Sequence, residues 1–354
     1  LNFMFQGLLN LGKNTDNARY RFYASLGYAD LHALNIDSRE ISRVSLGNIN
    51  ANYLRVSRGD LTGTIDATGL VLESDTGRHD IGDLHIESQS GDDNYTIRLI
   101  SGFADGTYSG SRAPGAFIKD IQDVTLRKEL AALFGGPEKK WDGSSYRLDF
   151  DFHDSRDLLS FAAPGAYIAD STSIRLRVSE DGTLRGRLSS PRVAMNGKYL
   201  KGLSMEFDNG NDALNFTVTG GELKLGQSIM LRDNAIMLYA RNNSVGLGYN
   251  YNNGTDLENR GEFYMTGDIS GSSPGAPAIS AKSLISNIYI NGENWNIDPA
   301  EYSYSADGAI IRGLRISNGE QVISVDGGIS ETSTDSLLVR LDNLNLSLAN
   351  SLTS

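Results

Sequence analysis

The stretch Tyr146-Arg147-Leu148-Asp149-Phe150-Asp151-Phe152 alternates apolar and charged side chains almost without a break. Successive side chains on a β-strand point to opposite faces of the sheet, whereas a helix repeats about every 3.6 residues. This spacing therefore predicts a strand with aromatic and aliphatic side chains on one face and charged side chains on the other.

The same two-residue period recurs along the chain. It covers residues 20–28, 95–99, 174–178, 203–207, 214–218, 245–251, 263–269 and 337–341. Turn-forming stretches such as Glu180–Gly182 and Asp208–Asp212 separate several of these runs, and their short length favours antiparallel hairpins. A parallel sheet would need helices between its strands, and helical periodicity is nearly missing. The sequence thus predicts an all-β protein built on a long antiparallel sheet.

Two segments break the pattern. Lys119–Phe134 has a partial helical stripe, and Gly135-Gly136-Pro137 would stop a helix there. We expect this helical insertion, residues 119–134, to cover an edge or an end of the sheet. A single short turn of helix is predicted over Asp157–Phe161. The rest predicts one continuous β-segment over residues 1–354, and we expect this segment to be cut from a longer chain.

Composition excludes several classes of function. The chain has 354 residues and a formal net charge of −12, whereas nucleic-acid binding needs a basic footprint, so no nucleic-acid partner is expected. The chain has no cysteine, which excludes disulfides, thiolate metal sites and cysteine nucleophiles. No run of 18 apolar residues is present, so no transmembrane helix is expected.

No catalytic or metal-binding motif emerges. The four histidines lack the spacing of a helical zinc site and are expected to be isolated surface residues. They are His32, His79, His85 and His153. Asp149 and Asp151 share one strand face, where paired carboxylates could cleave glycosides, but a solvated sheet face is the simpler interpretation. Asp208–Asp212 is expected to be a turn rather than a calcium loop, because it lacks a bidentate glutamate. We therefore expect no enzymatic activity, no cofactor and no metal.

Three short stretches share a glycine within an apolar alternation. They are Leu61–Ala67, Leu184–Leu188 and Ile311–Ile316. Their irregular spacing argues against a solenoid with a fixed repeat length. The similarity indicates many related strands in one sheet.

The C-terminal third, and two earlier stretches, resemble a known family. The stretches are Phe103–Gly110, Pro164–Asp170, Glu293–Pro299, Tyr302–Gly308, Ile316–Gly327 and Leu337–Leu346. They are similar to translocation and assembly module proteins of the TamB type, an AsmA-like group of repeating β-groove proteins, in the form found in Bacteroidetes-type bacteria. The resemblance spans residues 80–350.

The resemblance implies a long curved antiparallel sheet that forms an open, taco-shaped groove with one short helix. It also implies a location in the periplasm, within a protein anchored in the inner membrane that reaches the outer membrane. Phospholipid would be the cargo. A barrel-assembly protein of the TamA type in the outer membrane would be a partner, through regions outside this segment. Such proteins are linked to lipid transport and to outer-membrane protein biogenesis.

The apolar side chains of the strands allow two interpretations. By themselves they favour the filled core of a β-sandwich or solenoid, because packed cores are the rule. The resemblance favours an uncovered groove wall, which would bind acyl chains with about 0.8 kcal/mol per buried methylene group. The predicted wall residues are Ile97, Leu99, Leu148, Phe150, Phe152, Leu176, Val178, Met205, Phe207, Phe216, Val218, Val245, Leu247, Met265, Ile288, Ile290, Val339 and Leu341.

We predict a lipid-transfer bridge that carries phospholipid between the inner and outer membranes. One alternative is a scaffold or chaperone-like module for outer-membrane β-barrel assembly, which would use sheet edges and the groove to hold unfolded strands. A second alternative is a secreted β-sandwich or solenoid that binds polysaccharide. That function would need exposed aromatic side chains beside paired acids.

Overall fold

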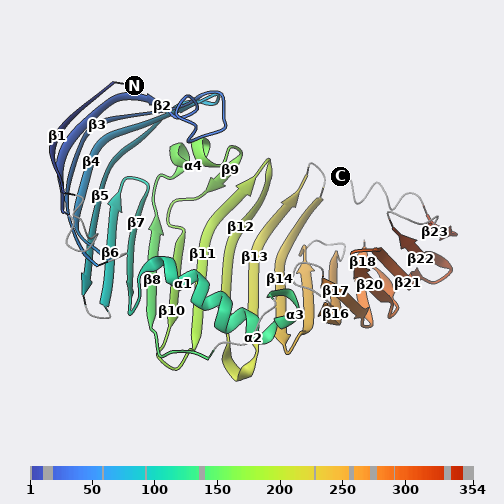
Figure 1. Ribbon diagram of the computed structural model, residues 1–354. Helices are drawn as coiled ribbons and strands as arrows, with labels where there is room; N and C mark the ends of the chain where they lie inside the picture. Colours follow the sequence, from blue (N-terminus) through green and yellow to red (C-terminus); the bar gives the residue numbers. More distant parts are fainter. Residues whose placement is uncertain are drawn as a thin grey trace. The chain divides into compact units, whose positions relative to one another are not determined.

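The computed structural model describes residues 2–10, 19–57, 60–91, 94–134, 140–226, 229–254, 259–271, 277–290, 292–330 and 336–345. These residues contain 23 β-strands, and every strand pairing whose register is given is antiparallel. The prediction of an all-β protein with an antiparallel sheet is therefore confirmed. The chain divides into two compact units, which are described separately below (Figure 1).

Unit 1 comprises residues 1–118, 142–182 and 186–197. Its strands are β1 (Asn2–Asn10), β2 (Arg19–Asp30), β3 (Ser42–Ser57), β4 (Asp60–Ser74), β5 (Gly77–Gly91), β6 (Asn94–Ser101), β7 (Ala104–Gly110), β8 (Tyr146–Phe152), β9 (Ala166–Ile168), β10 (Ser173–Val178) and most of β11 (Leu184–Met195). Strands β1 to β8 pair in chain order, β10 pairs with β8, and β9 pairs with β11. The eight steps from β1 to β10, at about 4.8 Å each, extend about 38 Å across the strands.

Unit 2 comprises residues 119–141, 183–185 and 198–354. Its strands are β12 (Lys198–Asp208), β13 (Leu214–Leu225), β14 (Ile229–Arg241), β15 (Ser244–Asn252), β16 (Arg260–Gly271), β17 (Pro277–Ser283), β18 (Ser286–Ile290), β19 (Glu293–Ile297), β20 (Glu301–Ser305), β21 (Gly308–Asn318), β22 (Gln321–Ile329) and β23 (Leu337–Asp342). A short 3-10 turn, η2 (Gly210–Asp212), lies between β12 and β13.

Two rows of the unit 2 sheet are each built from two short strands. β16 pairs with β17 through one half and with β18 through the other, so β17 and β18 are parts of one row. β19 and β20 form the next row, because β19 pairs with β18, β20 pairs with β17, and both pair with β21. Pro299 lies between β19 and β20, where its missing N–H interrupts the ladder. The unit is therefore a simple meander despite its split strands.

Bulges interrupt the alternation of side chains in two strands and keep the apolar side chains before and after the bulge on the same face of the sheet. Gly69 in β4 has φ +63 and Gly313 in β21 has φ +71, a backbone conformation that favours glycine. Both sit at register shifts, and an aspartate on the neighbouring strand accepts each glycine N–H at 2.8 Å, Asp83 for Gly69 and Asp326 for Gly313. A bulge bends its strand and increases the local twist, so these positions curve the sheet.

The helical segments lie where the sequence predicts them, with different ends. The insertion begins at Pro114 rather than Lys119, because proline is well suited to the first position of a helix. It consists of α1 (Pro114–Asp120), a π-helical turn η1 (Ile121–Leu126), α2 (Arg127–Glu129) and α3 (Ala131–Phe134). The second short helix, α4, spans Arg156–Ala162.

Helix α4 fixes the curvature of unit 1. It follows β8 in the chain, yet it packs against β4 and β5, so the sheet curls until these elements meet (Figure 1). The Phe161 ring is covered by the Arg39 guanidinium at 4.1 Å and contacts the His79 ring edge-on at 6.3 Å. The Phe161 carbonyl accepts a hydrogen bond from Arg39, and Asp157 accepts the N–H of Asp80 at 3.1 Å.

Asp37 orients Arg39 in this contact. Its carboxylate accepts hydrogen bonds from Nε and Nη2 of the guanidinium and one from the Ser42 hydroxyl. The side-chain hydrogen bonds from Arg39 are the main cause of a pKa of Asp37 well below its usual value, followed by the backbone N–H of Arg39 and the Ser42 hydroxyl. The ionised carboxylate is therefore part of the folded structure at neutral pH.

We predict that Phe161→Ala lowers the free energy of unfolding by about 3 kcal/mol, because it leaves a cavity between α4, Arg39 and His79. Urea unfolding followed by circular dichroism measures the change. Ile118→Ala, at an exposed helical position, is the matched control and should change stability by less than about 0.5 kcal/mol. Equal effects of the two substitutions would contradict the role of α4.

Candidate functional site

One face of unit 1 carries a row of apolar side chains that crosses nearly every strand. Phe22, Ala51, Ile65, Ile86 and Leu99 lie directly opposite one another on β2 to β6. The row continues through Gly106, Phe150 and Ile174 on β7, β8 and β10. The large side chains of this row are half-buried rather than buried. A second layer of side chains would bury them, so this apolar face remains accessible.

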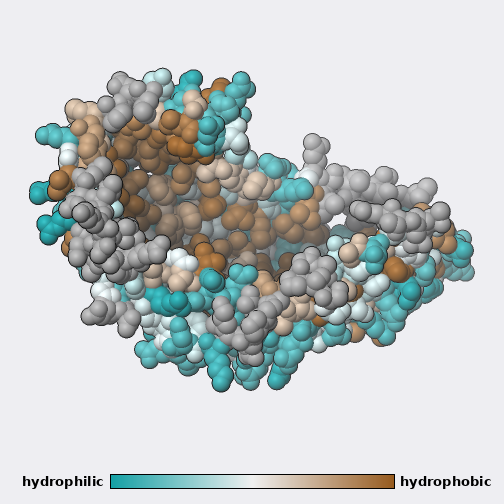
Figure 2. Space-filling model, in the orientation of Figure 1, coloured by the Kyte–Doolittle hydropathy of each residue, from teal (hydrophilic) through white to brown (hydrophobic). Residues whose placement is uncertain are grey.

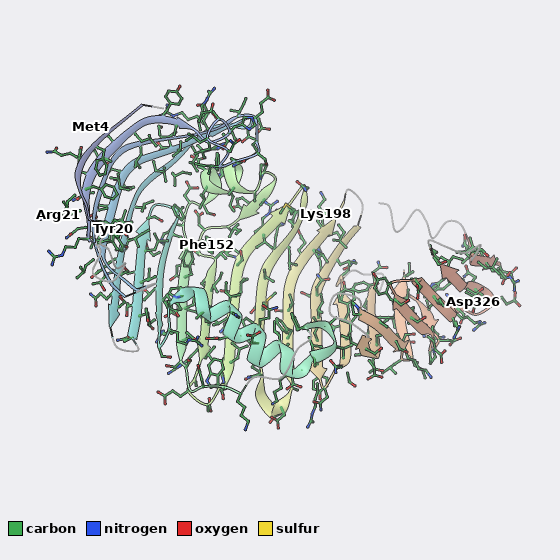
Figure 3. The ribbon with its side chains drawn as sticks, in the orientation of Figure 1. Met4, Tyr20, Arg21, Phe152, Lys198 and Asp326 are labelled. Carbon is green, nitrogen blue, oxygen red and sulfur yellow. The ribbon has the colours of Figure 1, made fainter. Side chains whose placement is uncertain are left out.

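The opposite face of unit 1 is polar. Figure 3 shows the neighbouring residues Tyr20 and Arg21 on opposite sides of β2. Asp66 and His85 lie on the outer side of β4 and β5, with Asp66 Oδ1 2.6 Å from His85 Nδ1. Figure 2 shows the other side of these strands as a hollow lined by hydrophobic residues. The two faces therefore differ in the way that the alternation of Tyr146–Phe152 predicts.

Phe150 sits at the centre of this apolar face because its neighbour on β7 is a glycine. A Cβ atom on Gly106 would lie 2.4 Å from the Phe150 ring, which shows that the ring covers the glycine backbone. The ring also contacts Phe152, with centroids 5.1 Å apart. This packing holds two aromatic rings flat on the sheet, where they form a broad apolar surface.

Unit 2 carries apolar rows of the same kind. Phe207, Phe216, Leu238, Leu247 and Met265 lie opposite one another on β12 to β16. The Phe207 and Phe216 rings stack with centroids 5.3 Å apart. A second row runs parallel to it and contains Met205, Val218, Ile236, Tyr249 and Phe263. None of these ten side chains is fully buried, so unit 2 also has an accessible apolar face.

Two tyrosines give the apolar face of unit 2 a polar border. The Tyr249 and Tyr251 rings stack with centroids 6.0 Å apart. The Tyr249 hydroxyl donates to Asn234 Oδ1 at 2.9 Å, and the buried Asn234 donates to the Leu231 carbonyl at 3.0 Å. Burial raises the pKa of both tyrosine hydroxyls, so both stay neutral over the physiological range.

The eighteen predicted wall residues all fall on the apolar faces of their own units. In unit 1 they are Ile97, Leu99, Leu148, Phe150, Phe152, Leu176 and Val178. In unit 2 they are Met205, Phe207, Phe216, Val218, Val245, Leu247, Met265, Ile288, Ile290, Val339 and Leu341. Val178 is only 2% exposed, so it is packed within the sheet and offers no surface to a ligand. A role of the other residues as a lipid-binding wall stays a prediction.

Sequence reasoning missed several residues of these rows. They include Phe22, Ile65, Ile86, Ile174, Leu238 and Tyr249. Each belongs to an apolar alternation, so the period was a sufficient signal for its face. Strand register, which places these residues opposite the predicted ones, depends on the bulges and could not be read from the period alone.

Over its described residues, the helical insertion does not cover an edge strand; in unit 1 it covers the apolar face where β7 and β8 meet their turn. In unit 1, Phe117 of α1 packs against Tyr108 and Tyr146, with ring centroids 6.1 and 5.2 Å apart. In unit 2, the Glu129 carbonyl accepts the N–H of Asn243 at 2.7 Å, and Asn243 Oδ1 accepts the N–H of Ala132 at 2.8 Å. The insertion therefore makes specific packing contacts in unit 1 and specific hydrogen bonds in unit 2.

One prediction about histidine is wrong. His79 is buried rather than on the surface, because α4 packs over it and its Nε2 lies 2.9 Å from the Thr76 hydroxyl and 3.1 Å from the Ser74 hydroxyl. Sequence spacing could not reveal this, since α4 lies about 80 residues further along the chain.

The acidic pairs behave as predicted. Asp149 accepts from Arg147 at 2.5 Å, and Asp151 accepts from Arg175 at 2.6 Å, on the outer polar face. Asp208 Oδ1 accepts the N–H of Gly210 at 2.7 Å, which closes the predicted turn.

Within the described ranges, no cluster of three or more potential metal ligands occurs. The helices of those ranges include none with the length and apolar character to cross a membrane.

We predict that Tyr249 and Tyr251 ionise at higher pH than an exposed tyrosine, because burial raises the pKa of both hydroxyls. The folded state holds these protons more tightly than the unfolded chain, so the stability that depends on them is complete below about pH 10 and declines as the pH rises through the raised pKa values. Ultraviolet titration of the folded protein should show a late-ionising tyrosine fraction that disappears in Tyr249→Phe/Tyr251→Phe. An unchanged late fraction in this variant would contradict the assignment.

No protein-family model, curated protein or solved structure matches this chain.

Proposed function

We propose that this chain binds the acyl chains of phospholipid along the apolar faces of its two units and works as a segment of a lipid-transfer bridge between two membranes. The observation that carries the proposal is the half-buried state of the apolar rows, from Phe22 to Ile174 in unit 1 and from Phe207 to Met265 in unit 2. Exposed apolar area of this extent is unfavourable in water, and a bound apolar ligand would remove it.

The arrangement suits sliding rather than capture at one point. Each methylene group that leaves water contributes about 0.8 kcal/mol, so a chain of a dozen methylenes gains about 10 kcal/mol before entropic costs. The rows repeat similar side chains on successive strands, so a chain that moves by one strand loses and regains nearly the same contacts. Such a surface binds without selecting a position and needs no catalytic residue.

The periplasmic location, the phospholipid cargo and a TamA-type partner in the outer membrane belong to this proposal. They are supported by the resemblance of the sequence to TamB-type proteins and by the uncovered apolar faces. The polysaccharide alternative gains no support, because Asp149 and Asp151, the acidic pair considered for glycoside cleavage, form ion pairs with arginines.

We predict that a photo-crosslinking amino acid at Phe150 or Phe216 captures lipid from bacterial membranes, because both side chains lie on apolar faces. The matched controls are Asp149 and Thr217, their sequence neighbours, which face the other side of the same strands. Mass spectrometry of the purified adducts identifies the lipid. Adducts at the control positions but not at the apolar positions would reject the proposal.

A second function is favoured by the two outermost strands of the described sheet. β1 exposes Met4 and Leu8, and β23 exposes Leu338 and Val339, with accessibilities of 54–59%. In the described residues, β1 pairs with β2 and β23 pairs with β22, and the proposed binding would add an extended segment to either strand. Such edges can hold an extended segment of an unfolded β-barrel protein.

We predict that Leu8→Lys and Leu338→Lys together weaken the binding of an unfolded outer-membrane β-barrel protein, since charges on edge strands oppose pairing. Co-purification with such a protein measures the effect. Lipid capture at Phe150 in the same variant serves as the control and should persist. Unchanged binding of the barrel protein would remove the support for this second function.

A further inference from the structure

Unit 1 holds two arginines side by side on its outer face. Arg147 of β8 and Arg177 of β10 lie directly opposite one another. Like charges in this position destabilise a sheet unless another charge balances them. Asp149 pairs with Arg147 through its Nε at 2.5 Å, but within the part of the chain that the structure describes, the Arg177 side chain has no ion pair and no hydrogen bond.

A pocket of about 650 Å³ adjoins these arginines at the ends of their strands. Its lining includes both guanidinium-bearing residues and the serines Ser109, Ser145 and Ser179. Among the described residues, the hydroxyl groups of these three serines form no hydrogen bond that would occupy them. Two arginines and three serines thus line one pocket.

We propose that Arg147 and Arg177, with the surrounding serine hydroxyls, bind a phosphate group. A guanidinium presents paired N–H donors that match two phosphate oxygens, and a bound dianion or monoanion would relieve the repulsion between the two arginines. Glu180 and Asp181 also line the pocket, so the phosphate is expected against the arginines rather than against the β10–β11 turn.

The position of the pocket relates it to the proposed function. Tyr146 and Val178 line the same pocket, and they belong to the apolar side of the same two strands. The pocket therefore lies where the apolar face of unit 1 ends. A phospholipid whose tails rest on that face would have its phosphate near this end, and to that extent the inference rests on lipid binding. Free phosphate is the other source of the same chemistry.

The test measures binding of two probes, inorganic phosphate and a soluble short-chain phosphatidic acid, by isothermal titration calorimetry. Arg147→Ala/Arg177→Ala should weaken phosphatidic acid binding at least about tenfold, because it removes two charge-assisted contacts. The matched control is Arg98→Ala on β6, which lies on the same outer face opposite Glu87 and outside the pocket, and it should leave the affinities unchanged. Circular dichroism melts verify that both variants fold.

The outcomes distinguish the proposed phosphate site from the apolar face of unit 1. Phosphatidic acid that binds more tightly than phosphate in the wild type, and that loses affinity in the double variant, assigns the site to a lipid headgroup. Equal, arginine-dependent binding of the two probes assigns it to free phosphate. Binding that survives the double variant, or that falls as much in Arg98→Ala, overturns the inference. Crosslinking of lipid at Phe150 is scored in the same variants, so that loss of the phosphate site with intact lipid capture leaves the proposed function standing.

Discussion

The structure depends on the register of its backbone hydrogen bonds. Side chains on a strand alternate between faces, so a slip of one residue between neighbours would move a whole strand's apolar side chains into the polar face. The row from Phe22 through Ile65 to Phe150 exists only because each ladder keeps its partner in place. The bulges at Gly69 and Gly313 also preserve the two faces, since they keep apolar side chains on one face where the two-residue alternation is interrupted.

Local patterns predicted the elements and their faces, while contacts between distant segments decided the rest. The alternation at Tyr146–Phe152 was enough to place Phe150 on an apolar face and Asp149 on a polar one, because a strand fixes both by geometry alone. The burial of His79 depends on α4, and the packing of Val178 depends on its strand neighbours. Neither the burial of His79 nor that of Val178 could be predicted from the residues next to it in the sequence.

The apolar faces also explain which residues form the packed interior. Fully buried positions are mostly small, such as Ala51, Ala67 and Ala104, and the largest side chains with less than 2% exposure among the described residues are Leu184 and Val178. A sandwich of this length would bury large aliphatic and aromatic side chains between its sheets. Here the large side chains of the apolar rows, such as Phe22, Phe150 and Leu247, are only half-buried, so a filled interior contributes less to folding than in a β-sandwich.

The meander has a consequence for how such a chain can change its size. Among the described residues of unit 2, the paired rows follow one another in chain order from β12 through to β23, so a duplicated or lost hairpin would leave the pairing of distant strands unchanged. Because neighbouring strands are antiparallel, the direction of the following strands is preserved only when strands are added or removed in pairs. The reach of the sheet can therefore grow in increments of about 9.6 Å without any change to the strands that already exist.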